Sequence, residues 1–278
     1  MTEISPTAPL TGSSPAGAAD PAAPQSDQLA LTGERTVPGI AAENYWFRRH
    51  EVAYEFVLDR CADLDVLEAG SGEGYGASML ATRARSVTCV DYDEQAVEHT
   101  RRRYPELIVH RGNLIDLPLA DASVDVVVNF QVIEHLWDQS AFVAECHRVL
   151  RPGGVLLMST PNRITFSPGR DTPLNPFHTR ELHAAELTEL LEQVPGSAGF
   201  TVEQMLGVYH GAALQALDDK WGGSIIDAQI ERALAGDDWP AELTADVAAV
   251  ATADFDIRSA AAADIDASLD LLAVAVRR

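Results

Sequence analysis

The sequence predicts an α/β fold in which a largely parallel sheet is covered by helices on both faces. From residue 64 onward, short apolar segments alternate with segments whose apolar residues have helical spacing. The expected strands are residues 65–70, 86–91, 107–112, 124–130 and 154–160. Nearly continuous apolar strands separated by helices are typical of parallel strands buried on both sides. Sheets of this kind bind ligands beyond the carboxyl ends of their strands.

Helices are expected between these strands and after the last of them. The segments with helical spacing are ASMLATRA (77–84), EQAVEHTRRR (94–103), SAFVAECHRVL (140–150) and ELHAAELTELLEQ (181–193). Two further strands are expected at 200–210 and 268–278. Because strands and helices alternate along most of the chain, we expect one large domain over residues 63–210 and 266–278.

Three segments lie outside this alternating pattern. Residues 1–30 are rich in Pro, Ala, Ser and Thr and are predicted to be a disordered tail, since they offer little apolar surface to bury. Residues 31–62 are expected to form a helical lead-in. Residues 211–265 are acidic, Ala-rich and helically spaced, and are expected to form an insert. A connection of that length usually serves as a lid, a binding insert or an oligomer surface, so a homodimer is among the expected arrangements.

Composition excludes several classes of function. The net charge is −22 and RRR at 101–103 is the sole basic cluster, so a nucleic acid would be repelled. The first residues lack the basic start and apolar core of a secretory signal, and no apolar run is long enough to span a membrane. The three cysteines are scattered, which fits a reducing cytoplasm. A carbohydrate or another neutral or cationic small molecule remains open as a substrate.

The run VLEAGSGEGYG (66–76) carries the first chemical signal. It is a strand followed by glycines and then a helix, and glycines let the backbone approach a ligand closely. The spacing is G-x-G-x-G, and Tyr75 stands where a dinucleotide motif has its last glycine. Glu68 precedes the glycines, where a carboxylate suits a cationic amine or sulfonium better than a pyrophosphate. Asp91 ends the next strand, where an acid accepts hydrogen bonds from ribose hydroxyls.

Five motifs in this order resemble the class I S-adenosylmethionine-dependent methyltransferases of the methyltransferase type 11 kind. They are E-A-G-S-G-E-G, V-D-Y-D, G-N-L-I-D-L-P, V-I-E-H-L and R-V-L-R-P-G-G-V-L-L-M-S-T-P-N, and they cover about residues 60–165. The resemblance implies a Rossmann-like sheet of seven strands in the order 3-2-1-4-5-7-6, with the last strand antiparallel. It also implies that S-adenosyl-L-methionine is the methyl donor.

The resemblance assigns the cofactor contacts residue by residue. The methionine moiety would be lined by Glu68, Gly70 and Gly72. The ribose would bind Asp91, with Tyr92 beside the adenine. The edge of the adenine would meet Asn113 and Leu114, although the family often has Asp where Asn113 stands. Asn129, near the end of the fourth strand, completes the predicted cofactor-binding residues.

The predicted catalytic residues are Glu134, His135 and His178, and three interpretations of the Glu134–His135 pair stay open. The pair can border the cofactor pocket and orient its neighbours. His135 can act as a general base for an oxygen nucleophile. The third interpretation is a divalent cation, since some relatives hold one with E-x-x-E-H and a later histidine. Here Gln131 replaces the first acid and His178 is the later histidine, which leaves a weaker donor set.

The acceptor side is predicted from loops at the same edge of the sheet. The Pro-rich stretch 161–182 is expected to bring Asn175, Phe177 and His178 to the pocket, and the strand ending at His210 leads to the same edge. Aromatic residues 45–47 of the lead-in either pack in the core or stack on sugar faces. The insert carries Trp221 and Trp239, and we expect it to form a wall for the acceptor.

These residues predict an O-methyltransferase that acts on a sugar hydroxyl of a polysaccharide or glycolipid precursor. N-P-F-H-x-x-E and the lead-in resemble enzymes of polymethylated polysaccharide biosynthesis, such as that of methylglucose lipopolysaccharide. One alternative is a C- or N-methyltransferase of a lipophilic small molecule such as a quinone. Another is a non-catalytic cofactor-binding protein that assembles with a partner through the insert.

Overall fold

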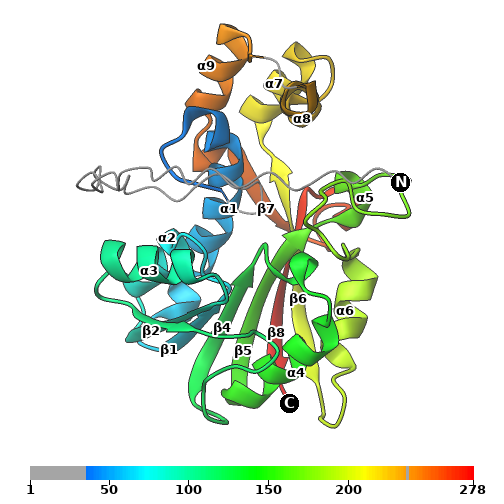
Figure 1. The fold of residues 1–278 in the computed structure, drawn as a ribbon. Coiled ribbons are helices and arrows are strands. Elements are labelled where there is room, and N and C mark those ends of the chain that lie inside the picture. Colours follow the sequence, from blue (N-terminus) through cyan, green and yellow to red (C-terminus); the bar gives the residue numbers. More distant parts are fainter. Residues whose placement is uncertain (1–35, 236–237) are drawn as a thin grey trace, which may run out of the picture.

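The computed structural model describes residues 36–235 and 238–278, and an eight-stranded sheet lies at its centre (Figure 1). The strand order is β3-β2-β1-β4-β5-β8-β6-β7. In chain order the strands are β1 (Asp65–Ala69), β2 (Ser86–Asp91), β3 (Ile108–Arg111), β4 (Val124–Phe130), β5 (Leu150–Pro161), β6 (Phe200–His210), β7 (Phe255–Ser259) and β8 (Asp270–Arg277). The tail predicted over residues 1–30 lies outside the described residues.

The topology confirms the Rossmann-like order and adds one strand. The first five strands pair in parallel, and β8 lies antiparallel between β5 and β6 as expected for the closing strand. The difference is β7, which pairs antiparallel with β6 at the edge of the sheet. It comes from the segment 211–265, for which only helices were predicted. Its sequence, FDIRS, is too short and too charged to stand out as a strand.

Helices cover both faces of the sheet, as predicted. They are α1 (Asn44–Val57), α2 (Tyr75–Ala81), α3 (Glu94–Arg103), α4 (Gln139–Val149), α5 (Arg163–Phe166), α6 (Ala184–Glu192), α7 (Ala212–Lys220), α8 (Ile225–Ala235) and α9 (Ala241–Ala249). Alternate strand residues face opposite sides, so Leu67 packs in one core with residues of α4 and α6. Val66 packs in the other core with residues of α1, α2 and α3. No helix among the described residues is long and apolar enough to cross a membrane.

Aspartates begin two of the helices at the edge of the sheet where strands end. Asp93 follows β2, and its side chain accepts a hydrogen bond from Gln95 N at 2.9 Å. Asp138 begins α4 and accepts from Ala141 N at 2.9 Å. Capping by a side-chain oxygen satisfies amides that have no partner within the helix. These caps therefore fix where the chain turns back after β2 and β4.

A third, smaller core lies above the carboxyl edge of the sheet, where Figure 1 shows α7, α8 and α9 beside the upper end of α1. It joins Tyr45 of α1 to Val208 of β6 and Phe255 of β7, with apolar residues of the insert helices around them. The Asn44 amide also donates to the carbonyls of Val247, Ala248 and Val250 at 3.1, 3.1 and 2.8 Å. The lead-in and the insert therefore pack as one unit.

Buried polar contacts attach α1 to the ends of the strands. Arg49 donates to both carboxylate oxygens of Asp270, at the start of β8, at 2.6 Å each. The two side chains are 2% and 1% exposed. Tyr54 donates to Glu68 Oε1 of β1 at 2.6 Å, and Tyr45 bonds to His210 Nε2 at the end of β6 at 2.7 Å. One face of the lead-in helix is thus held against three strands.

We expect Arg49→Met to lower the free energy of unfolding by about 3–5 kcal/mol, because it leaves the Asp270 carboxylate buried without its partner. Urea unfolding monitored by circular dichroism measures the change. Arg48→Met is the matched control on the same helix. It removes a partly exposed pair with Glu51, and a loss below about 1 kcal/mol is expected.

The double variant Arg49→Met with Asp270→Leu removes both charges, so it should recover part of the lost stability. Equal stability losses in Arg49→Met and Arg48→Met would contradict the importance of the buried pair.

Candidate active site

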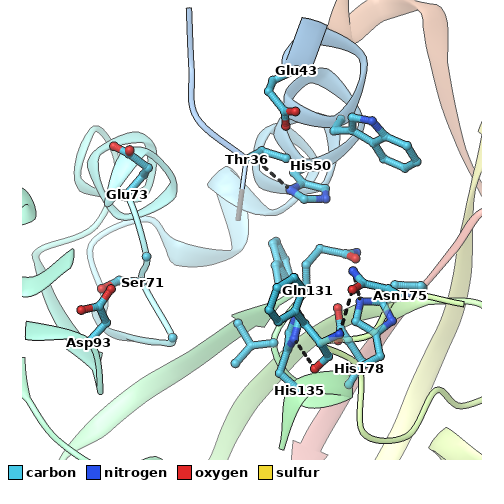
Figure 2. Close-up of a pocket in the computed structure, with 18 of the residues that line it drawn as sticks. Thr36, Glu43, His50, Ser71, Glu73, Asp93, Gln131, His135, Asn175 and His178 are labelled. Carbon is cyan, nitrogen blue, oxygen red and sulfur yellow. Dashed lines mark hydrogen bonds between the residues drawn. The ribbon is translucent and has the colours of Figure 1, made fainter. Parts of the chain in front are cut away.

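A cavity of about 1370 Å³ opens at the carboxyl edge of the sheet. Its wall combines the glycine loop after β1, the ends of β2 and β4, the loop after β5, the lead-in helix and α8. In Figure 2, Ser71, Glu73 and Asp93 lie on one side, while Gln131, His135, Asn175 and His178 lie together on the other. The cavity is larger than the roughly 300–1,000 Å³ of a typical single-ligand site. It therefore has room for two ligands side by side.

The glycine loop adopts a backbone that larger residues would disturb. Gly70 has φ +86°, and a Cβ there would lie 2.6 Å from a methyl group of Val132. Gly72 has φ +48° and donates its N–H to Asp91 Oδ2 at 2.8 Å. Asp91 Oδ1 accepts from Asp93 N at 2.9 Å. The two backbone amides orient the Asp91 carboxylate at the cavity wall, where it can accept hydroxyl groups.

Six of the predicted cofactor contacts line the cavity: Gly70, Gly72, Asp91, Tyr92, Asn113 and Leu114. Tyr92 is exposed at the rim of the cavity, whereas Leu114 is buried. Asn113 Oδ1 accepts from Ile115 N at 3.2 Å, which fixes the side chain in its loop. These residues come from the ends of β1, β2 and β3, so the parallel sheet itself brings them together.

The other two predicted contacts, Glu68 and Asn129, do not line the cavity. Glu68 is 1% exposed and lies behind Tyr54, whose hydroxyl donates to it. Burial raises the pKa of Glu68 to about 8, although the hydrogen bond from Tyr54 favours the ionised form. Asn129 donates to the carbonyl of Ala69 at 2.7 Å and joins the ends of β4 and β1. Neither residue therefore reaches the cavity wall in this structure, and their contacts with the cofactor stay predictions.

The predicted catalytic residues come together on the opposite wall. One ligand atom each from Glu134, His135 and His178 lies within 4.8 Å of the others. The two imidazole rings meet edge to face with centroids 4.8 Å apart. Glu134 Oε2 accepts from the Thr160 hydroxyl at 2.9 Å. Burial, with a smaller contribution from nearby acids such as Asp270, raises the pKa of Glu134 to about 8, although the hydrogen bond from Thr160 favours the ionised form.

Hydrogen bonds define which nitrogen of each imidazole faces its neighbours. His135 Nδ1 lies 3.1 Å from the carbonyl of Phe177, so this nitrogen carries a proton and donates. His178 Nδ1 lies 2.7 Å from Glu181 Oε1 and donates to it in the same way. His178 Nε2 accepts from Asn175 Nδ2 at 3.1 Å. In the neutral rings, Nε2 therefore carries the lone pair that can accept a proton or bind a cation.

The loop after β5 reaches the cavity as the sequence predicted. Asn175, Phe177 and His178 all line it. Asn162 anchors the start of this loop, because its amide donates to carbonyl groups of the turn before β8, among them that of Ser268 at 3.1 Å. The hydroxyl of Thr179 donates to the carbonyl of Leu136 at 2.7 Å. The loop is therefore fastened to both β8 and the segment that carries His135.

Two residues expected at the acceptor side lie elsewhere. His210 does not line the cavity, because its ring lies between the Tyr45 hydroxyl and the Asp218 carboxylate, at 2.7 and 2.6 Å. Trp221 donates to Asp246 at 2.8 Å and lines a separate, smaller pocket in the insert. Trp239 does line the main cavity. The insert thus contributes to the cavity wall through Trp239 and part of α8.

Several cavity residues were missed by sequence reasoning. Tyr54 was not singled out, yet its ring covers Gly76, where a Cβ would lie 2.1 Å from Tyr54 Cζ. His50 lies one turn before it, and burial lowers the pKa of this imidazole to about 4. The spacing of Tyr45, Arg49 and Tyr54 on one helix face was an available signal. Gln131 was considered only as a weak metal donor, and no sequence pattern indicated the backbone bend beside the site, where its φ is +56°.

Comparisons with known proteins agree with this geometry. Residues 67–158 match the family model described as "Methyltransferase domain". A probable S-adenosylmethionine-dependent methyltransferase of Mycolicibacterium smegmatis is 68% identical over 249 residues, which cover 90% of this chain and 95% of that protein. The chain belongs to the S-adenosylmethionine-dependent methyltransferases.

Two more distant proteins share part of this pattern. A ubiquinone biosynthesis O-methyltransferase of Mesorhizobium japonicum is 28% identical over 192 residues, covering 63% of this chain and 76% of that protein. A solved methyltransferase from Thermotoga maritima, described as a possible histamine N-methyltransferase, superposes with a TM-score of 0.56. At 18% identity, and with 84% of this chain and 93% of that one covered, it shows the shared fold alone.

The glycine-loop side of this methyltransferase fits the methyl donor, S-adenosyl-L-methionine. The donor carries ribose hydroxyls, an ammonium group and a sulfonium, which call for acceptor oxygens. Asp91 supplies one carboxylate at the cavity wall. Glu73 supplies another, and its Oε1 is buried with no hydrogen-bond partner among the described residues while Oε2 pairs with His99 at 2.8 Å. The residues present therefore match the charge and hydrogen-bonding groups of the donor.

The raised pKa of Glu68 predicts a pH dependence of stability. Its ordinary value is 4.5 and its folded value is about 8, so between these values the folded protein holds a proton that the unfolded chain has lost. The free energy of unfolding should therefore fall as pH rises through this window, by up to about 1.4 kcal/mol per pH unit for one proton. Glu68→Gln has no such proton, and urea unfolding at pH 6 and pH 8 should show a smaller decrease than in the parent.

Glu55→Gln, an exposed change on α1, is the control and should keep the parent's pH dependence. The same decrease in Glu68→Gln as in the parent would show that Glu68 does not hold the proton.

Proposed function

We propose that this methyltransferase transfers the methyl group to a hydroxyl oxygen of a carbohydrate acceptor. The proposal is carried by one observation. The cofactor side and the Glu134–His135–His178 cluster face each other within the same cavity. A donor placed along the glycine loop would leave the other half of the cavity for an acceptor. Much of the rate in such a displacement comes from holding the two partners in line.

His135 is suited to receive the proton of the hydroxyl group. Its Nδ1 is committed to the carbonyl of Phe177, so Nε2 carries the lone pair. When bound, the cofactor supplies a methyl group on a positively charged sulfur, which leaves as a neutral thioether. The acceptor oxygen forms the new C–O bond, and its proton passes to His135 Nε2. A positioned base of this kind typically contributes about 10²–10⁴-fold to the rate.

His178 and Glu181 support this arrangement from behind. Their side chains are 4% and 1% exposed, and the 2.7 Å contact between them orients the imidazole. Phe166 stacks on the His178 ring with centroids 5.3 Å apart. Because the ring is held on two sides, its Nε2 already faces the cavity. The side chain therefore loses little rotamer entropy when the acceptor binds. We assign His178 to orienting the acceptor or its neighbour Asn175.

The lining of the acceptor half favours a polyhydroxylated molecule. Gln131, His50 and Asn175 offer uncharged polar groups, and Trp239 offers an aromatic face. Aromatic faces beside amide groups suit the alternating C–H and O–H surfaces of a sugar ring. The net charge of −22 disfavours anionic acceptors. The Mesorhizobium relative is named as an O-methyltransferase, which supports an oxygen acceptor here.

A second candidate mechanism uses a divalent cation near the acceptor hydroxyl. Glu134, His135 and His178 are close enough to share one ion, and Gln131 lines the same cavity. In histidines that bind metals, the N–H group of the other ring nitrogen commonly donates a hydrogen bond to a carboxylate or carbonyl. His178 donates in this way to Glu181, and His135 donates to the carbonyl of Phe177. When bound, a cation would make the hydroxyl group more acidic. It would occupy His135 Nε2, so the two mechanisms are exclusive.

We expect His135→Ala to lower kcat by about 10²–10⁴-fold, because the hydroxyl proton loses its acceptor. A panel of sugars, quinones and amines, assayed with labelled S-adenosyl-L-methionine, first identifies the acceptor. The affinity for S-adenosylhomocysteine, measured by calorimetry, should stay unchanged. His110→Ala, on the exposed edge strand β3, is the control and should retain the parent kcat.

A His135→Ala variant with the parent kcat would remove His135 from the reaction. Turnover of quinones or amines with none of sugars would overturn the carbohydrate acceptor, while the methyltransferase assignment would stand.

Exhaustive chelation separates the two mechanisms. With His135 as the base, activity should survive treatment with EDTA. If the cation mechanism holds, chelation should abolish turnover, and Mg²⁺ or Mn²⁺ should restore it in the parent. Glu134→Gln should then need a higher concentration of the ion, since an amide contributes no charge to the site.

A further inference from the structure

The lead-in and the insert form the roof of the acceptor half of the cavity. The proposed methyl transfer and proton transfer use none of the residues of this roof. Besides His50, the residues there are Glu43, Trp46, Gln229, Ile230 and Trp239. Figure 2 shows Glu43 and His50 projecting from the lead-in toward the cavity, opposite Gln131 and Asn175. The roof therefore faces the proposed catalytic wall across the space where an acceptor would lie.

Among the described residues, Glu43 is the one acid of this roof, and its carboxylate has no partner there. It precedes α1 at the N-cap position, yet its side chain accepts no capping hydrogen bond. Within residues 36–235 and 238–278, no hydrogen bond or ion pair of this carboxylate is found. The side chain is partly buried, and burial raises the pKa of the carboxyl group. An acid in this position gains most from a ligand that donates hydrogen bonds to it.

Two indoles line the same roof as this carboxylate. Trp46 follows Glu43 by three residues, so both lie on the same side of the first helical turn. Trp239 comes from the segment before α9. Both rings are partly buried and pack against the third core, and both line the cavity. The lead-in and the insert therefore each place one rigid aromatic face in the roof.

A carboxylate and two indoles in one roof suit two kinds of ligand, a polyol or a cation. The Arg49 guanidinium lies 5.5 Å from the centre of the Trp46 ring and also lines the cavity. Because this guanidinium, paired with Asp270, already lies over the Trp46 ring, a second cation cannot stack on the same face of the indole. Hydroxyl groups carry no charge, and two neighbouring hydroxyls match the two oxygens of one carboxylate. The arrangement therefore favours the polyol.

We propose that Glu43, Trp46 and Trp239 form a subsite that binds a neighbouring pair of hydroxyls on the acceptor sugar. The Glu43 carboxylate accepts both hydroxyls, and the indoles pack on the C–H face of the ring. This subsite rests on the proposed function, because it assumes that the acceptor is a carbohydrate. It makes Glu43 a residue that determines acceptor specificity, separate from the residues that take part in methyl transfer.

Steady-state kinetics of Glu43→Ala tests the subsite with the sugar acceptor identified above. We expect KM for the acceptor to rise about 10- to 100-fold, the range for a lost hydrogen bond to a charged group, with kcat nearly unchanged. S-Adenosylhomocysteine affinity by calorimetry should equal that of the parent. Glu55→Ala, which changes an exposed acid of α1 outside the cavity, is the matched control.

Two further variants distinguish binding from an indirect structural effect. Glu43→Gln keeps an acceptor oxygen, so it should recover part of the lost affinity for a sugar. Trp239→Ala, outside any helix or strand, should also raise the acceptor KM while leaving cofactor affinity intact. Acceptors that lack one hydroxyl complete a double-mutant cycle. In the parent the deoxy acceptor should bind more weakly, and in Glu43→Ala that difference should disappear.

The outcomes separate this inference from the proposed function. If the parent methylates a sugar and Glu43→Ala has the same KM as Glu55→Ala, the subsite is wrong and the carbohydrate acceptor stands. If the parent methylates no sugar, the carbohydrate acceptor and the polyol subsite both fail. If it methylates an amine, and Glu43→Gln loses as much affinity as Glu43→Ala, the roof binds a cation and the polyol subsite is overturned.

Discussion

The buried ion pair between Arg49 and Asp270 holds the active site together, because it seats the lead-in helix on the carboxyl edge of the sheet. Removing two charges from water is costly, and two short hydrogen bonds with good geometry offset that cost. With α1 fixed there, Tyr54 reaches Glu68 at the first strand and Tyr45 reaches His210 at the sixth. The cavity thus has a roof whose two parts, the lead-in and the insert, are far apart in the sequence.

The parallel sheet and most of the cofactor side could be predicted because their signals are local. Apolar strands, glycines and a terminal acid such as Asp91 lie in one short stretch each, and parallel strands bring their ends to one edge. The roof could not be predicted in the same way. His210 was predicted at the correct edge of the sheet. Its ring is directed toward the third core by contacts with Tyr45 and Asp218, and these contacts join separate segments of the chain. The strand β7 was missed because its pairing with β6, and not its own composition, defines it.

Glu68 shows how packing between elements adds a contact that the motif itself does not contain. Its position near the end of the first strand follows from the apolar pattern, and the resemblance implies a direct role at the cofactor. The structure adds Tyr54, which comes from a different element and covers the carboxyl group. A motif identifies the backbone that surrounds a site, while the side chain that closes over it depends on packing between elements. The same reasoning applies to Asn129, which joins β4 to β1 beneath the loop.

The contact between Tyr54 and Gly76 limits how this protein can vary. Any side chain at position 76 would collide with the phenol ring, so a larger residue there requires a smaller one at 54. A smaller residue at 54 would in turn leave Glu68 without its hydroxyl donor. The three positions are therefore expected to change together across related sequences or not at all. A designer who alters the lead-in helix to admit a different acceptor would have to treat these three residues as one unit.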